Sequence, residues 1–232
     1  MMPLYEAKMI HHYDTRWATY KPDGSTRPMT EVEKAAHKVP LPRYWVPERE
    51  IDKKLDGKWD KPWFLGWRDV ARSTDERTFI TALLPRTAIN HKVLLALPTR
   101  GRREDLQGAL TSFVYDYVAR QKIGGTSMGY FTVNQLPVPT PEDRLAHLDL
   151  EWLGTRVDRL NGWISDADER ARVRAEIDAY FFHLYGLTRE DVEYVMDTFP
   201  IIKRKDEERY GEYRTTRLIL DAYDTLAREW VA

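Results

Sequence analysis

The chain has 232 residues, of which 42% are hydrophobic and 12% aromatic, a composition that supports a packed core and excludes a disordered polypeptide. It contains no cysteine, which excludes disulfides and cysteine-based metal sites. The net charge is −1, but residues 1–141 carry 22 Lys and Arg against 16 Asp and Glu, whereas residues 142–232 carry 14 against 21. Such asymmetry indicates nucleic-acid contact by the basic half or an ordinary solvated surface.

The N-terminal segments predict short elements separated by turns. Residues 4–20, rich in Tyr, Ile, His and Trp, predict two strands around a turn near Asp14. Thr30 and Glu33 form a capping box that opens a short helix. Pro47 fits the first position of the next helix, because its missing N–H has no partner there anyway.

Residues 63–70, 77–84 and 92–97 predict three further strands from their β-branched and aromatic content. Apolar residues between 106 and 118 recur at helical spacing and predict one helix. The end of this helix is followed by a Gly-Gly turn, a short strand and a proline-rich exit that ends at Pro141. Glycine there is expected to supply a positive φ.

After residue 141 the strand patterns give way to helical ones. Residues 170–185 have one apolar face and Gly186 as a stop, and Thr188 caps the following helix. Residues 218–226 belong to a final amphipathic helix. The predicted fold class is therefore α+β, with a mixed-sheet α/β domain over residues 1–141 and an α-helical region over residues 142–232.

The sequence lacks the common catalytic motifs. It has no G-x-G, so a glycine turn for S-adenosylmethionine is missing, and no Pro-Pro pair to hold an extruded base. It has no phosphate loop, H-E-x-x-H or G-x-S-x-G motif. His11 and His12 are adjacent, and on a strand their side chains would point to opposite faces, so no metal site is assigned. We expect no catalytic residue, metal or cofactor on this chain.

Four segments, in order along the chain, carry a family resemblance. They are PLYEAKMIHHYDTRWATY (3–20), WRDVARSTDERTFITALLP (67–85), the helix and Gly-Gly turn of residues 113–141, and the helical stretch 174–224. Together they resemble the C-terminal target-recognition region of adenine-specific DNA methyltransferases and of Type II (IIG-like) restriction–modification enzymes in bacterial phage defence.

The resemblance implies that the chain reads double-stranded DNA for a catalytic partner. The S-adenosylmethionine cofactor and the DNA-(adenine-N6) methyltransfer would belong to a methyltransferase domain or subunit, so the chain is expected to be a fragment or a stand-alone specificity chain. No apolar run reaches the roughly 20 residues that span a bilayer, and no signal pattern opens the sequence, which favours a cytoplasmic location without membrane contact.

Basic and hydroxyl side chains in loops and at helix ends are the candidate DNA contacts, since Lys, Arg, Ser and Thr suit phosphates and Arg or Gln suit base edges. They are Lys8, His11, Arg16, Arg27, Arg72, Arg77, Arg100, Arg102, Arg103, Arg120, Gln121, Lys122, Thr126 and Ser127. Local alternatives remain: Arg72 and Arg77 could pair with Asp75 or Glu76, and Arg120 could complement the helix end.

A protein-interaction scaffold of a phage-defence complex, acting through the acidic helical half, is the alternative function.

Overall fold

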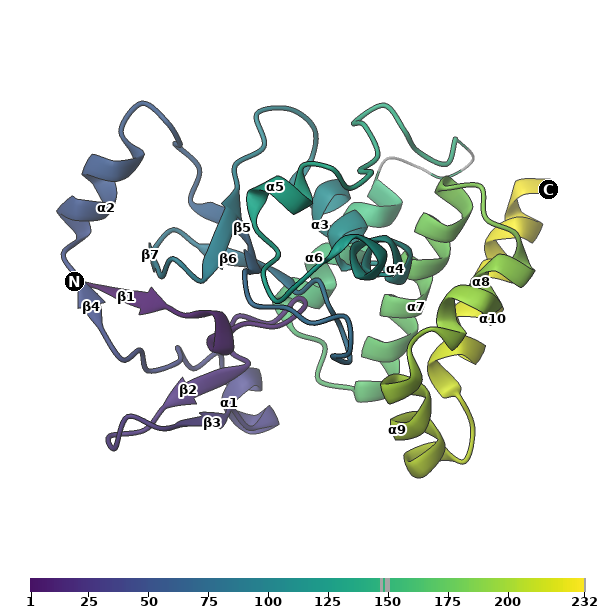
Figure 1. Cartoon of the computed structure of the whole chain (residues 1–232), viewed down its shortest axis with the longest axis horizontal. Helices are drawn as coiled ribbons and strands as arrows, with labels where there is room; N and C mark the ends of the chain where they lie inside the picture. The colour runs from purple at the N-terminus through teal and green to yellow at the C-terminus, as the bar shows by residue number, and fades with distance from the viewer. Residues whose placement is uncertain (147, 149–150, 232) are drawn as a thin grey trace.

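The computed structural model describes residues 1–146, 148 and 151–231, with side chains through residue 228. The fold is α+β, with the strands at one end and helices α6–α10 at the other (Figure 1). The strands are β1 (Met2–Tyr5), β2 (Ala18–Tyr20), β3 (Thr26–Pro28), β4 (Trp45–Val46), β5 (Trp63–Arg68), β6 (Thr81–Pro85), β7 (Ala88–Ile89) and β8 (Val93–Ala96). The helices are α1 (Glu31–Ala35), α2 (Glu48–Leu55), α3 (Arg103–Thr111), α4 (Phe113–Lys122), α5 (Tyr130–Val133), α6 (Glu151–Gly162), α7 (Ala167–Leu184), α8 (Arg189–Asp197), α9 (Pro200–Tyr210) and α10 (Arg214–Val231).

Three small sheets make up the strand-rich end. β1 lies between β4, to which it is antiparallel, and β7, to which it is parallel. β2 and β3 form an antiparallel hairpin, and β5 is the central strand of the antiparallel sheet β6-β5-β8. Gly66 lies in the middle of β5, where a Cβ would approach Leu84 Cδ1 to 2.6 Å, so the packing of β6 requires glycine there.

The N-terminal predictions are largely confirmed. β1 and β2 flank a turn closed by the His11–Asp14 bridge, although the two strands pair with other strands and not with each other. The capping box of Thr30 and Glu33 is present at α1. Pro47 precedes α2 as its N-cap, one position earlier than predicted. The pair His11 and His12 lies in this turn and not on a strand.

The predicted helix over residues 106–118 is two helices. Ser112 has extended backbone angles and separates α3 from α4. Its hydroxyl oxygen accepts the amide of Tyr115 and its O–H donates to the carbonyl of Ala109, so Ser112 caps α4. The apolar periodicity continues through the break, which explains why the pattern alone predicted a single helix.

The short strand predicted after the Gly-Gly turn is wrong, because residues 130–133 form helix α5. The only pairing around this loop within the described residues is a single antiparallel bridge between Val70 and Ser127. Farther on, the helical predictions are confirmed: α7 ends before Gly186, whose φ is +70°, and Thr188 forms a capping box with Asp191 at α8.

The helices α3 and α4 lie between the β6-β5-β8 sheet and the C-terminal helices (Figure 1). Leu110 and Tyr115 pack with Leu65 of β5, whereas Phe113 and Val114 belong to the core of α6–α10. This pair of helices therefore contributes to two of the three hydrophobic clusters in the described part of the chain. The domain boundary at residue 141 stays a prediction.

Candidate nucleic-acid interface

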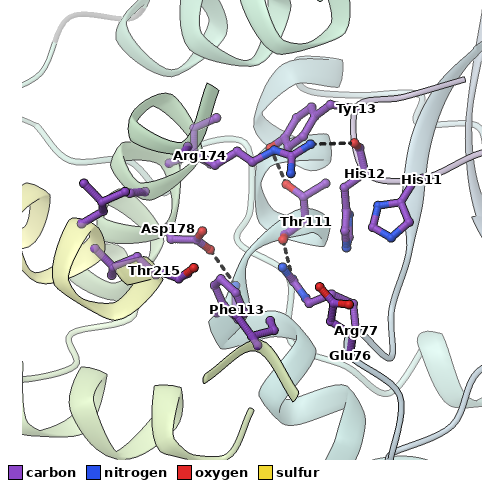
Figure 2. Close-up of a pocket in the computed structure, with 16 residues that line it drawn as sticks. His11, His12, Tyr13, Glu76, Arg77, Thr111, Phe113, Arg174, Asp178 and Thr215 are labelled. Carbon is purple, nitrogen blue, oxygen red and sulfur yellow. Dashed lines mark hydrogen bonds between the residues drawn. The ribbon is translucent and has the colours of Figure 1, made fainter. Parts of the chain in front are cut away.

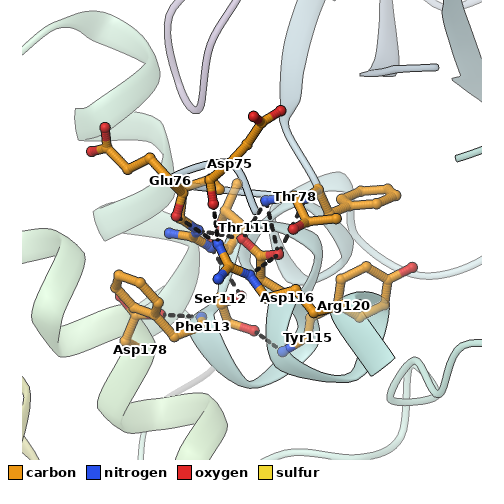
Figure 3. A network of polar contacts seen from close by, with 12 residues as sticks. Asp75, Glu76, Thr78, Thr111, Ser112, Phe113, Tyr115, Asp116, Arg120 and Asp178 are labelled. Atoms are coloured by element: carbon orange, nitrogen blue, oxygen red, sulfur yellow. Dashed lines mark hydrogen bonds and ion pairs between the residues drawn. The ribbon is translucent and has the colours of Figure 1, made fainter. Parts of the chain in front are cut away.

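A buried carboxylate, Asp116 of α4, holds the loop that follows β5 (Figure 3). Its oxygens accept hydrogen bonds from Arg77 Nε at 2.5 Å, from the amide of Thr78 at 3.0 Å and from the amide of Phe79 at 3.2 Å. Arg120, one turn along α4, brings its Nε to 3.7 Å. Two guanidinium groups and two amides thus compensate one fully buried charge.

This network also explains a wrong prediction. Residues 77–80 were expected to continue the strand, but β6 begins only at Thr81. The amides of Thr78 and Phe79 donate to the Asp116 carboxylate instead of to a neighbouring strand. A side-chain acceptor has replaced the sheet ladder, which local strand propensity cannot reveal.

A second set of bonds fastens the start of the same loop to the Gly-Gly turn. The amide of Met128 donates to the carbonyl of Asp69 at 2.7 Å, and the amide of Ala71 donates to the carbonyl of Thr126 at 3.1 Å. The Asp69 carboxylate accepts from Lys92 at 2.8 Å and from the hydroxyl of Ser127 at 2.5 Å. The Lys92 ammonium and this hydroxyl hold the pKa of Asp69 below its usual value.

These bonds place residues 69–71 beside residues 126–128, and we call residues 69–72 and 121–131 the Gly-Gly loop surface. Five of the predicted contact residues belong to it, and all are exposed: Arg72, Gln121, Lys122, Thr126 and Ser127. Among the described residues, no carboxylate lies within ion-pair distance of Arg72 or Lys122. Phe131 of α5, at the end of the same stretch, is 85% exposed. The surface therefore combines uncompensated positive charge, hydroxyl groups and an exposed aromatic ring.

The two glycines of the turn do not have the role that was expected of them. Neither Gly124 nor Gly125 has a positive φ, and a Cβ at either position would meet no atom within 4 Å. The backbone therefore does not require glycine here. What glycine provides is an open surface with no side chain, across which a large ligand can approach the backbone.

Arg77 and Arg120 belong to the interior. Besides pairing with Asp116, Arg77 donates to the carbonyls of Thr111 and Ser112. Arg120 donates to the carbonyls of Asp75, Glu76 and Thr198, and burial lowers its pKa. The alternative pairing of Arg77 with Asp75 or Glu76 is not what the structure shows. Both arginines position the loop and do not belong to the Gly-Gly loop surface.

The other predicted residues are dispersed. Arg27, Arg102 and Arg103 pair with Glu33, Glu151 and Asp158 respectively. Lys8 lies over the ring of Tyr20, His11 packs on Trp17, and Arg16 bonds to His37. Arg100 is exposed in the loop before α3. These residues do not join the Gly-Gly loop surface.

Sequence reasoning missed Asp116 and a group of polar residues on α7. Arg174 and Asp178 share a helix face with the buried Phe181 and Phe182, at spacings i, i+4, i+7 and i+8. An ionisable pair on an otherwise apolar, buried face was the available signal. Asp116 likewise occupies the apolar stretch of α4, between buried Tyr115 and buried Ala119.

No known family model matches this sequence, and no curated protein shows significant sequence similarity to it. Among the described helices, none has both the length and the apolar character needed to cross a bilayer. The part of the chain that is described also holds no group of three or more His, Asp or Glu side chains arranged to bind a metal ion.

Proposed function

We propose that this chain binds double-stranded DNA in a sequence-specific manner, as the target-recognition part of a site-specific DNA adenine methyltransferase or restriction–modification enzyme in the cytoplasm. The observation that carries the proposal is the Gly-Gly loop surface, where Arg72, Lys122 and Thr126 are all exposed. Lys and Arg on phosphates supply affinity, and hydroxyl and amide groups add directional contacts. The family resemblance of the four sequence segments gives independent support.

In this proposal the loop between β5 and β6 and the Gly-Gly turn approach the DNA together. The backbone of the turn is free of side chains at Gly124 and Gly125, so its amides can come close to phosphates. Gln121 would be suited to an adenine edge in the major groove, whereas Arg72 and Lys122 would contact phosphates. Methyl transfer and S-adenosylmethionine would belong to the partner domain or subunit.

The test is a fluorescence-anisotropy titration of labelled duplexes at several salt concentrations. Specific binding should show a preferred duplex sequence, and affinity should fall linearly with salt on a logarithmic plot because bound cations are released. Absence of binding, or binding that is insensitive to salt, would contradict the proposal.

A protein-interaction scaffold is the second candidate, and the exposure of Phe131 favours it, because exposed large apolar side chains mark protein contacts. The two functions separate by substitution. If F131A leaves DNA affinity unchanged while it abolishes association with a methyltransferase subunit, Phe131 serves the partner and not the DNA.

A further inference from the structure

A cavity of about 200 Å³, lined by both polar and apolar side chains, lies apart from the Gly-Gly loop surface (Figure 2). It is bounded by the His11–Tyr13 turn, the junction of α3 and α4, and helices α7, α9 and α10. Polar side chains line it on several sides: His12 and Arg77 face Asp178 and Thr215 across the space, with Arg174 between them. Ile177 and Ile219 give it an apolar part.

His12 is the least satisfied polar residue of this cavity. Its side chain is buried, with only 4% of the residue exposed, and neither Nδ1 nor Nε2 has a hydrogen-bond partner. Burial lowers the pKa of His12, so the ring is neutral and offers one donor and one acceptor. Leaving both ring nitrogens without a hydrogen bond raises the free energy of the folded protein. A ligand that hydrogen-bonds to the ring removes this penalty.

Arg174 adds an uncompensated positive charge. Its terminal nitrogen donates to the carbonyl of His12 at 3.3 Å, while its buried Nε has no partner. Among the described residues, no carboxylate lies within 4 Å of its guanidinium. Arg77, the other cation of the cavity, is neutralised by Asp116. An anion is therefore the natural complement of Arg174.

Asp178 cancels this charge only in part at neutral pH. One of its oxygens accepts the amide of Phe113 at 2.7 Å. Burial raises the pKa of Asp178 to about 7, so that the carboxyl is protonated for much of the time. A protonated carboxyl can donate a hydrogen bond to an anionic oxygen, as the Thr215 hydroxyl also can.

We propose that this cavity is a binding site for a small oxyanion, a carboxylate or phosphate group that pairs with Arg174 and hydrogen-bonds to His12. A cavity of about 200 Å³ has the liquid volume of roughly seven waters, which suits such a group with a few carbon atoms against Ile177 and Ile219. The inference does not depend on DNA binding.

The test is a titration of the full chain, labelled with ¹⁵N-histidine, with inorganic phosphate and separately with acetate at constant ionic strength. The His12 ring nitrogens should shift saturably at millimolar probe concentrations. The probe that saturates at lower concentration identifies the group as phosphate or carboxylate. Because phosphate also stabilises proteins by exclusion from their surface, a saturable shift and not a rise in Tm is the criterion.

Two variants and a control sharpen the result. R174Q removes the cation and should weaken binding by at least about tenfold, as expected for a charged hydrogen bond. A171M leaves every hydrogen bond in place and narrows the cavity from the preceding turn of α7, so it should also abolish the shift. R172Q removes an exposed guanidinium of the same helix and should bind as the parent does.

The proposal is overturned if neither probe gives a saturable shift, or if R172Q weakens binding as much as R174Q does, which would indicate diffuse charge attraction. Should R174Q fail to fold, unchanged binding in A171M overturns it equally.

Discussion

Arg77 and Asp116 are 39 positions apart in the sequence, yet Arg77 Nε lies 2.5 Å from Asp116 Oδ2 inside the protein. The same carboxylate accepts the amides of Thr78 and Phe79. One side chain of α4 therefore fixes both a guanidinium and a stretch of backbone in the loop after β5. The exposed Arg72 lies on that loop, so the interior network sets the position of the candidate interface.

We expect D116A to destabilise the fold by about 3–5 kcal/mol, because it leaves the buried Arg77 without its counter-charge. Urea denaturation followed by tryptophan fluorescence measures the change. D75A is the matched control: its carboxylate is exposed in the same loop, and its removal should change stability by less than about 0.5 kcal/mol. Equal effects of the two substitutions would show that the network contributes little.

The double substitution R72Q/K122Q should weaken duplex binding and lower the salt slope by about two, since each lost phosphate contact removes nearly one unit. K53Q/K54Q on α2, at the far end of the strand-rich part, removes the same charge and should leave both quantities unchanged (Figure 1). Anisotropy titrations at matched salt concentrations compare the two. If the two double substitutions weakened duplex binding equally, net charge alone would drive binding.

Alanine substitutions should distinguish glycines that the backbone requires from glycines that it does not, by their effect on Tm. G124A and G125A should leave Tm unchanged or slightly higher, because φ is not positive there and a Cβ meets no neighbour. G186A, where φ is +70°, should cost about 1 kcal/mol. Differential scanning calorimetry of the three variants measures these changes in Tm. A marked loss in G124A would restore the view that the turn requires glycine.

The buried Asp178 should make stability fall as the pH rises. Its pKa is near 3.8 in the unfolded chain and about 7 in the folded protein, so folding binds a proton between these values. The associated stability is fully present below pH 3.8 and is lost progressively up to about pH 7.

The variant D178N keeps the oxygen that accepts the amide of Phe113 but cannot ionise. Its Tm relative to the parent should therefore increase between pH 5 and pH 8, by on the order of 5 °C. The histidines of the same cavity titrate in both proteins, so the difference between them isolates Asp178. A Tm difference independent of pH would be the contrary result.

The features that sequence predicted are those that few neighbouring residues determine. The capping boxes at Thr30 and Thr188 need only a side chain and an amide three positions away, and both are present. β8 was recognised from its own composition. The α+β class follows from the change of pattern near residue 141, which is a property of composition and periodicity.

The features that sequence did not predict depend on distant partners. Arg77 and Arg120 have the same local appearance as Arg72, a cation near a turn or helix end. Only the position of Asp116 makes two of them interior and leaves the third exposed. For the candidate interface, the predicted contacts Arg72 and Lys122 are exposed, but the sequence could not show that other candidates lie elsewhere.

The loop after β5 is anchored at Asp69–Ala71, at the carbonyls of Asp75 and Glu76, which accept from Arg120, and at Thr78–Phe79. The exposed side chains of residues 72–74 between the first two anchors therefore contribute little to the stability of the fold. Residues 72–74 can therefore be replaced without changes to α4. Related chains could differ at these positions in what they recognise and still have the same fold. A cysteine introduced at Ser73, in a protein that has none, would also offer a unique position for a fluorescent probe beside the Gly-Gly loop surface.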